Sequence, residues 1–196
     1  MLSDGFHDVP AGKVAMVVTF LEMRAPQLRN VALPQGLTFT KITPDAETYR
    51  DLFRRVGQDW LWFSRNLLSD SALTDILNNP KVQVFTLMKD GRAEALLELD
   101  FREDRACELA YFGVTPTLIG TGAGAYLMDR AVDLAFAGEI ERFHVHTCTI
   151  DSQQALAFYQ RSGFRPVRQK IEIADDPRIH HGYDSALAPH VPIIAP

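Results

Sequence analysis

The stretch Val114-Thr-Pro-Thr-Leu-Ile-Gly-Thr-Gly-Ala-Gly-Ala125 decides the fold of this chain. Its three glycines, at positions 120, 122 and 124, follow a predicted strand and open a predicted helix that runs to about residue 137. The first amides of a helix have no partner within the helix and carry partial positive charge. Glycine lets such a backbone approach an anion without a Cβ in the way. The pattern therefore favours an anion-binding loop over a merely flexible connection.

Two common phosphate-binding motifs fit this stretch poorly. A Walker loop is excluded because no Lys-Ser or Lys-Thr pair follows the glycines. The dinucleotide fingerprint is formally present as Gly120-x-Gly122-x-x-Ala125, but that fingerprint belongs after the first strand of a βαβ unit. Here the glycines follow the third strand of a meander, with residues 115–118 in between. The context argues against a dinucleotide-binding domain.

The residues before the loop predict antiparallel strands. Residues 82–88 and 93–101 form a hairpin pattern around a central Asp-Gly turn, and residues 107–114 add a third strand. Further upstream the sequence predicts strands over 13–23 and 37–42. A helix is expected from Pro44 to about Val56 with Thr43 as its N-cap, and a short helix is expected after the cap Ser69.

The residues after the loop predict a strand, a helix and a last strand. The strands are expected over 143–149 and 164–173, and the helix between them is expected to start at the cap Asp151, with Gln154 as capping-box partner. The whole order predicts one α+β domain with a mixed, mostly antiparallel sheet flanked by helices and an extra N-terminal strand. We expect a loose N-terminus over 1–12, the domain over 13–176 and an irregular tail over 177–196.

The composition and net charge of the chain limit which classes of binding partner it can have. With 46% hydrophobic and 23% charged residues, the 196-residue chain reads as an ordinary globular protein. Its net charge of -5 argues against nucleic-acid binding and favours a cationic partner such as an amine. We expect Cys107 and Cys148 to be small core residues without a disulfide, and the protein to be located in a reducing cytoplasm. The apolar run 14–21 is too short to span a membrane and no targeting segment is evident.

Two segments together resemble a known family. The stretch 114–127 looks like the acetyl-CoA signature of the GCN5-related N-acetyltransferases, in which a Val-x-Pro strand end precedes a Gln/Arg-x-x-Gly-x-Gly/Ala loop. Residues 152–164, Ser-Gln-Gln-Ala-Leu-Ala-Phe-Tyr-Gln-Arg-Ser-Gly-Phe, are similar to the family's second signature, Asn-x-x-Ala-x-x-Phe-Tyr closing in Gly-Phe. The element order over about 37–173 is also the family's. Ile119 stands where Gln or Arg is usual, and Ser152 stands where Asn is usual.

The resemblance implies acetyl-CoA as cosubstrate and assigns residues to it. Backbone amides of the loop would face the pyrophosphate, and the pantetheine arm would pair near Val114 in a V-shaped gap between that strand and residues 143–149. The Phe112 amide would polarise the thioester carbonyl, and Tyr159 would protonate the departing thiolate. The implied cofactor-binding set is Val114, Ile119, Gly120, Thr121, Gly122, Ala123, Gly124, Ala125 and Ser152. Aromatic packing is the alternative role for Tyr159.

Several carboxylates are candidates for the base that deprotonates the amine. Glu108 lies six residues before Val114, matching the glutamate of histone-modifying members. Alternation places it on one face with Ala110, Phe112 and Val114. A solvent-exposed strand end is the alternative. Glu98 and Asp100 are further candidates, for which an exposed strand face is the simpler interpretation.

Histidines and aromatic residues complete the candidates. His144 and His146 share a strand face, but no further ligand stands nearby, so we expect no metal; His146 could replace Glu108 as base. Trp60, Trp62 and Phe63 either line the acceptor pocket or fill the core.

The favoured function is transfer of an acetyl or short acyl group from CoA to a small-molecule or peptide amine by direct attack. A catalytically silent acyl-CoA-binding module and a dinucleotide-dependent oxidoreductase are the alternatives. The long N-terminal strand and the tail could serve a homodimer.

Overall fold

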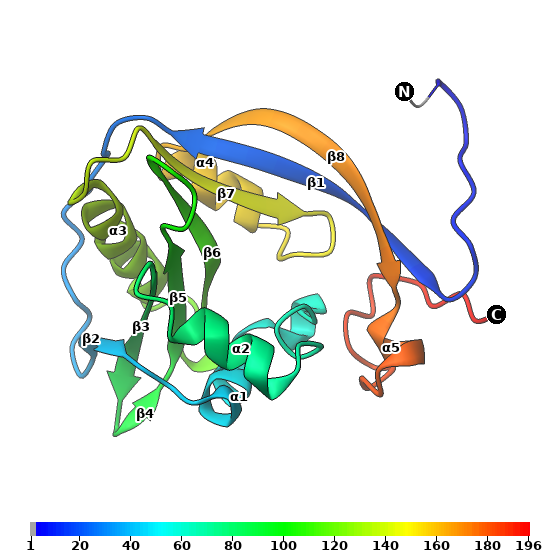
Figure 1. Ribbon diagram of the computed structural model, residues 1–196, viewed down its shortest axis with the longest axis horizontal. Coiled ribbons are helices and arrows are strands. Elements are labelled where there is room, and N and C mark those ends of the chain that lie inside the picture. The colour runs from blue at the N-terminus through cyan, green and yellow to red at the C-terminus, as the bar shows by residue number, and fades with distance from the viewer. Residues whose placement is uncertain (1–2) are drawn as a thin grey trace.

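An eight-stranded sheet forms the centre of the molecule (Figure 1). In the computed structural model, which describes residues 3–196, the strands lie in the order β2-β3-β5-β6-β7-β1-β8, and the short β4 pairs with β3. Only β6 and β7 pair in parallel; the other pairs among the described strands are antiparallel. The strands are β1 (Lys13–Met23), β2 (Thr38–Ile42), β3 (Val82–Lys89), β4 (Arg92–Ala93), β5 (Ala95–Asp100), β6 (Ala106–Val114), β7 (Arg142–Cys148) and β8 (Arg165–Asp175). The predicted mixed, mostly antiparallel sheet with an extra N-terminal strand is confirmed.

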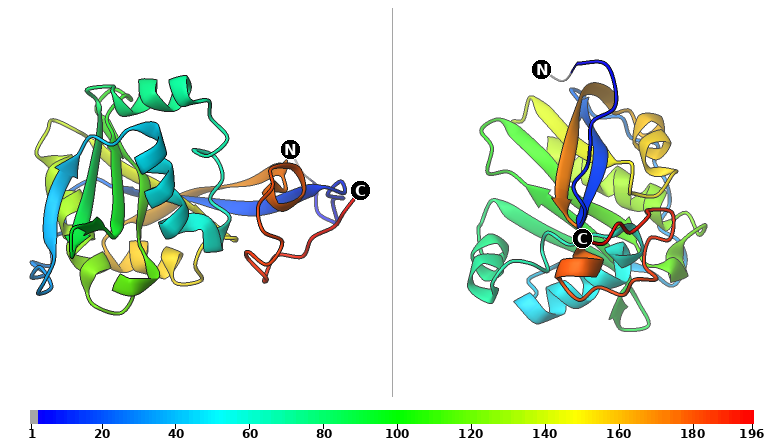
Figure 2. Two further views of the ribbon diagram at one scale, coloured as in Figure 1. Left: turned by 90° about the horizontal axis from the view of Figure 1, so that it is seen from below. Right: turned by 90° about the vertical axis from the view of Figure 1, so that its right-hand side faces the viewer.

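Helices cover both faces of this sheet (Figure 2). They are α1 (Ala46–Gly57), α2 (Asp70–Leu77), α3 (Ala123–Phe136), α4 (Ala155–Arg161) and α5 (Pro177–His180), with single 3-10 turns at η1 (Gln58–Trp60) and η2 (Pro116–Leu118). Strand alternation divides the core: Leu97 and Leu99 of β5 pack in the cluster with α3, whereas Leu96 packs in the cluster with α1. The sheet is therefore buried on both sides around β5 and β6.

Three helix starts test the predicted caps. Ser69 caps α2 as predicted, with its Oγ accepting from the Ala72 amide at 3.2 Å. The prediction of Thr43 as cap of α1 is wrong, because the Asp45 carboxylate accepts from the Thr48 amide at 2.8 Å and the helix begins at Ala46. The predicted cap of α4 is also wrong: that helix begins at Ala155 without a side-chain cap.

The longest pairing in the sheet is between β1 and β8, which runs from Lys13 opposite Asp175 to Glu22 opposite Arg165. The two strands extend side by side beyond the other strands to α5 (Figure 1). Their inner face, with Val14, Met16 and Val18, packs against Leu61, Ile150 and Ala188 in a third apolar cluster. This cluster fixes the C-terminal segment against the body of the domain.

Candidate active site

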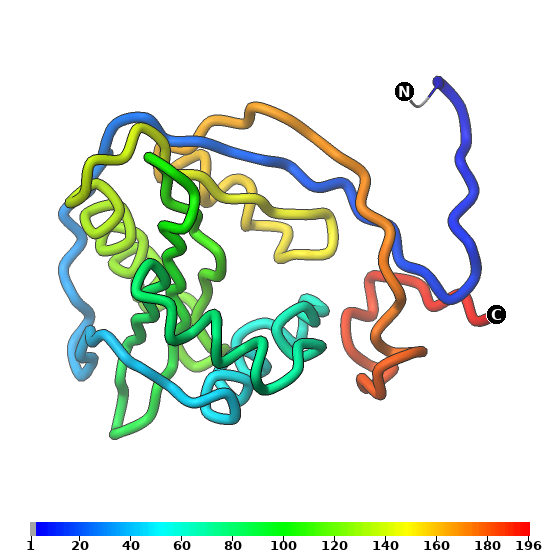
Figure 3. The backbone as a smooth tube through the Cα atoms, viewed as in Figure 1, coloured from blue at the N-terminus to red at the C-terminus, as the bar shows by residue number. Residues whose placement is uncertain are grey.

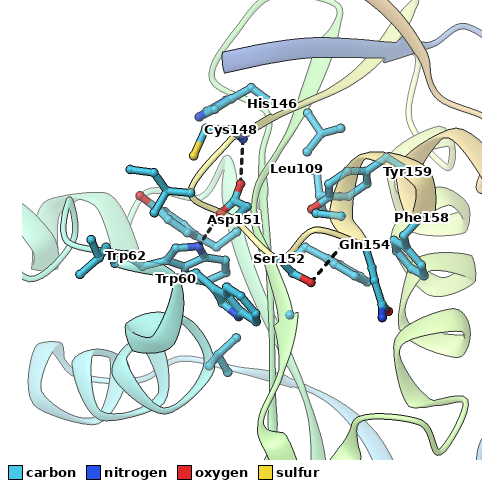
Figure 4. A pocket seen from close by; sticks show the side chains of 18 of the residues that line it. Trp60, Trp62, Leu109, His146, Cys148, Asp151, Ser152, Gln154, Phe158 and Tyr159 are labelled. Atoms are coloured by element: carbon cyan, nitrogen blue, oxygen red, sulfur yellow. Dashed lines mark hydrogen bonds between the residues drawn. The ribbon is translucent and has the colours of Figure 1, made fainter. Parts of the chain in front are cut away.

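A cavity of about 520 Å³ opens between β6 and β7 (Figure 4). The two strands pair only over three positions, from Ala106 opposite Arg142 to Glu108 opposite His144. Beyond these positions they diverge, and the cavity fills the gap. It reaches from Ile119 and Gly124 at the glycine loop to residues 60–64 on the other face of the sheet. The gap therefore connects the two faces.

The glycine loop has the geometry of an anion site. Gly120 and Gly122 have φ of 78° and 85°, a region that favours glycine, and Gly122 is the N-cap of α3. Within residues 3–196 the amides of Gly124 and Ala125 donate to no protein acceptor. A Cβ added at any of the three glycines would meet no atom within 4 Å, so the space before the helix is open. Unpaired amides facing open space at a helix start suit a phosphate group.

A β-bulge changes which residues of β6 share a face. Leu97 of β5 lies opposite Phe112, but Leu99 lies opposite Leu109, so Ala110 is the extra residue. Leu109 and Phe112 consequently pack on the α3 side, whereas Tyr111 packs with α1. Glu108, adjacent to Leu109, projects away from the α3 side. The prediction that Glu108 shares a face with Phe112 and Val114 is wrong for this reason.

Glu108 instead contacts His146, which lines the cavity. The distance from its Oε1 to Nδ1 of His146 is 3.4 Å. This carboxylate raises the pKa of His146, while the histidine lowers the pKa of Glu108. Glu108 itself is absent from the cavity wall. The structure thus joins two predicted residues into a pair, with His146 at the surface of the gap.

Tyr159 of α4 lines the same cavity from the α3 side. Its ring packs at 6.3 Å from that of Phe112 and at 5.9 Å from that of Phe164, both between ring centroids. In Figure 4 it lies beside Leu109, with the hydroxyl end toward the pocket. Burial raises the pKa of the Tyr159 phenol, so it stays protonated at neutral pH. Both predicted roles, packing and proton donation, are compatible with this position.

The loop after β7 forms the rim of the cavity near Ser152. Asp151 does not cap α4, because its carboxylate accepts from Trp62 Nε1 at 3.1 Å and from the Cys148 amide at 3.0 Å (Figure 4). It also accepts from Thr147 Oγ1 at 2.7 Å. Ser152 Oγ accepts from the Gln154 amide at 3.4 Å. Asp151 therefore connects the end of β7 to the aromatic segment across the gap.

Trp60, Trp62 and Phe63 all line the cavity on the face opposite α3. Trp62 also packs on Phe53 and Tyr111, with ring centroids 5.4 Å away in each case. Its ring lies so close to Gly57 that a Cβ there would be 2.1 Å from Trp62 Cδ2. The two roles expected for the aromatic cluster, pocket wall and core, thus coincide in Trp62.

Two predicted carboxylates do not reach the cavity. Glu98 is fully buried (0% exposed), where Tyr49 OH and Arg65 Nη2 both donate to it, the latter at 2.5 Å. Asp100 is held by the Arg102 guanidinium, with Nη2 to Oδ2 at 2.5 Å. The interpretation of these two as an exposed strand face is wrong, because both carboxylates are buried and each is paired with an arginine. Glu98 therefore does not reach the cavity as a candidate base would.

Other cavity residues lie outside the sequence candidates. Met16, Glu172 and Cys148 contribute from β1, β8 and β7. Burial raises the pKa of the Cys148 thiol to about 11. Because β1 and β8 are far from the glycine loop in the sequence, no local signal predicted that they line the cavity.

The described part of the chain has neither a cluster of metal ligands nor a membrane-spanning helix. Among residues 3–196, no cluster of three or more His, Cys, Asp or Glu side chains could hold a metal ion. None of the helices in the same range is long and apolar enough to cross a membrane.

The sequence of this chain is similar to those of known N-acetyltransferases. An uncharacterised N-acetyltransferase of Mycobacterium tuberculosis (strain ATCC 25618 / H37Rv) is 31% identical over 99 residues, which cover 50% of this chain and 62% of that protein. The match therefore spans less than two thirds of the length of that relative.

Solved structures share the fold at lower identity. A GCN5-related N-acetyltransferase from Sphaerobacter thermophilus aligns with a TM-score of 0.62 at 13% identity, covering 82% of this chain and 52% of the other. An aminoglycoside acetyltransferase from an uncultured soil metagenomic sample, in complex with sisomicin, aligns with a TM-score of 0.51 at 16% identity, covering 65% and 87%. The Acetyltransferase (GNAT) family matches residues 47–164, more than half of the chain. With the sheet, the gap and the glycine loop in agreement with that match, the chain belongs to the GNAT family of acetyltransferases.

Proposed function

We propose that the protein transfers an acetyl or short acyl group from acyl-CoA to an amine. The observation that carries the proposal is one continuous cavity between the unpaired amides of the glycine loop and the His146–Tyr159 region. A diphosphate fits the open start of α3, because glycines leave the backbone uncovered there. The extended pantetheine arm would lie in the gap along β6, near Val114. The Phe112 amide is proposed to polarise the thioester carbonyl, with Ser152 at the rim.

In the proposed reaction the amine nitrogen attacks the thioester carbon directly. The new C–N bond forms, the C–S bond breaks, and the amine proton passes to His146 directly or through water. Glu108 holds that imidazole by the contact at Nδ1 and stabilises its protonated form. Tyr159 gives its phenol proton to the departing thiolate and is reprotonated from solvent.

The state of Cys148 supports direct attack over a covalent intermediate. Its thiol faces the cavity, but a pKa of about 11 leaves little thiolate at neutral pH. An acyl-cysteine step would need that thiolate as nucleophile. Cys148 is therefore proposed to act as an apolar wall residue in a reducing, cytoplasmic setting.

The acceptor side favours a small cationic or peptide amine. Trp60, Trp62 and Phe63 offer aromatic surface, and Glu172 of β8 adds a carboxylate to the lining of the same cavity. Aromatic faces and carboxylates both attract ammonium groups. The soil aminoglycoside acetyltransferase, whose structure contains sisomicin, is consistent with acceptors of this class.

The test separates this proposal from its alternatives. Purified protein is incubated with acetyl-CoA and a panel of amines, and thiol release and acylated amine are measured; thermal stabilisation by CoA and by NAD is measured in parallel. We expect stabilisation by CoA and amine-dependent thiol release. Stabilisation by CoA with no turnover across the panel would favour the silent binding module, and stabilisation by NAD alone would favour the oxidoreductase.

We also infer a homodimer that forms along β8. This edge strand exposes Val167 (55%), Ile171 (52%) and Ile173 (52%) on an 11-residue length. Its first half is basic, with Arg165, Arg168 and Lys170, and its second half carries Glu172 and Asp175. Antiparallel pairing with a second copy would place each basic half opposite an acidic half. A second copy is therefore the partner that the edge fits best.

A further inference from the structure

The connection between β1 and β2, residues 24–37, crosses the outer side of α3 on its way to β2 (Figure 3). It first passes the end of α4, where Gln27 lies so close to Gly163 that an added Cβ would be 2.5 Å from its Oε1. It then reaches α3 at Asp129. This segment precedes the family match, which begins at residue 47.

Arg29 is the residue of this connection that lies between the two helices. Its Nη2 donates to the carbonyl oxygen of Ala125 on α3 at 3.1 Å, and its guanidinium carbon is 6.0 Å from the ring centroid of Phe158 on α4. Phe158 lines the cavity, and Ala125 belongs to the first turn of α3. The guanidinium therefore lies between the first turn of α3, which follows the proposed phosphate site, and a side chain of the cavity wall.

Asp129 fixes Arg29 in this place. Its buried carboxylate accepts from the backbone amides of Arg29 and Val31, at 3.2 and 2.9 Å, and from Arg29 Nε at 3.3 Å. Nη1 donates to no acceptor within residues 3–196, and the side chain remains 34% exposed. A guanidinium held at Nε with Nη1 free is oriented in advance for a further anion.

The glycine loop itself lacks a cation at its first position. Ile119 stands there, 66% exposed, and offers no hydrogen bond to a phosphate. Backbone amides supply only partial charge, so a diphosphate at the start of α3 gains from a full positive charge nearby. The connection that carries Arg29 reaches the first turn of α3 from outside the loop.

We propose that Arg29 binds a phosphate group of the acyl-CoA cosubstrate, supplying from the β1–β2 connection the cation that the loop lacks. The inference rests on the proposed function. The phosphate is either the diphosphate or the 3′-phosphate of CoA, since both share the chemistry that a guanidinium recognises.

Isothermal titration with CoA and with 3′-dephospho-CoA tests the proposal. Arg29→Gln is expected to weaken CoA binding roughly 10- to 100-fold, the range for one charge-assisted hydrogen bond. An equal loss with dephospho-CoA assigns the contact to the diphosphate, and a loss seen only with CoA assigns it to the 3′-phosphate. Arg130→Gln is the matched control, because Arg130 pairs with Asp133 on the same helix and its loss should leave affinity unchanged. Thermal unfolding of each variant verifies the fold.

A rescue variant separates charge from structure. Ile119→Arg in the Arg29→Gln background returns a cation to the loop and is expected to recover most of the affinity. If Arg29→Gln binds CoA as tightly as the wild type, or if Ile119→Arg recovers nothing, the proposal is overturned. A wild type that fails to bind CoA at all would instead refute the proposed function, so the two failures are distinguishable.

Discussion

At the residue scale, the contact between Glu108 and His146 sets the pH at which the proposed base works. A base must be neutral, so kcat/KM should rise with pH as His146 loses its proton. Because Glu108 raises the pKa of His146, that ascending limb lies above the pH of an ordinary histidine. Glu108→Gln removes the charge and should move the limb to lower pH, which a pH profile of kcat/KM measures.

His146→Gln is the companion variant for this profile. It should lower kcat/KM roughly 10²- to 10⁴-fold, the usual range for a general base, and abolish the limb. An unchanged limb in both variants would show that a different group or solvent takes the amine proton.

Gly57 is a second residue whose substitution reports on the acceptor wall. A methyl group at Gly57 would overlap the Trp62 ring, with the nearest ring atom 2.1 Å away. Gly57→Ala should therefore displace Trp62, raise KM for the amine and destabilise the fold by about 1–3 kcal/mol. Chemical denaturation and steady-state kinetics measure the two effects. Gly138→Ala is the control, since its Cβ would meet nothing within 4 Å. If the two variants have equal stability and equal KM, the close contact between Gly57 and the Trp62 ring is refuted.

At the element scale, a side chain added at the start of α3 should leave folding intact but should interfere with CoA binding. Gly124 lies in the first turn with open space around it. Gly124→Val places a side chain where the diphosphate is proposed to bind, so the Kd for CoA should rise more than tenfold. The melting temperature should stay level or rise slightly, because glycine is a poor helix former. Unchanged CoA affinity would place the diphosphate elsewhere.

The elements also show what the sequence could predict. The Asp-Gly turn, the cap Ser69 and the glycines before α3 are local signals, and the hairpin, the start of α2 and the start of α3 are found where these signals predict them. The bulge at Ala110 has no local signal, since it arises from the register of β6 against β5. The burial of Glu98 depends on Arg65 and Tyr49, 33 and 49 residues away along the chain. The orientation of Glu108 and the burial of Glu98 were therefore predicted wrongly because both depend on contacts between segments that are distant in the sequence.

At the scale of the whole molecule, the β8 edge predicts the oligomeric state. Ile171→Lys with Ile173→Lys should convert the inferred dimer to a monomer, because the added charges disrupt apolar contact across the edge. Analytical ultracentrifugation measures the change. Val9→Lys, exposed in the N-terminal segment, is the control and should leave the dimer intact. A wild type that sediments as a monomer at micromolar concentration would contradict the inference.

At the scale of the whole molecule, the proposed donor and acceptor sites lie on opposite faces of one sheet. The glycine loop and Tyr159 lie on the α3 side, whereas His146 and the aromatic residues lie on the α1 side, and the gap between β6 and β7 joins them. The proposed acyl transfer takes place through this gap.

The most direct test compares wild type and Tyr159→Phe by amine-dependent release of the CoA thiol from acetyl-CoA, with CoA affinity measured on the same samples. We expect kcat to fall roughly 10²- to 10⁴-fold with the Kd for CoA unchanged, because the phenol acts on the departing thiolate and the ring still packs against Phe112. A Tyr159→Phe variant as active as the wild type would contradict it.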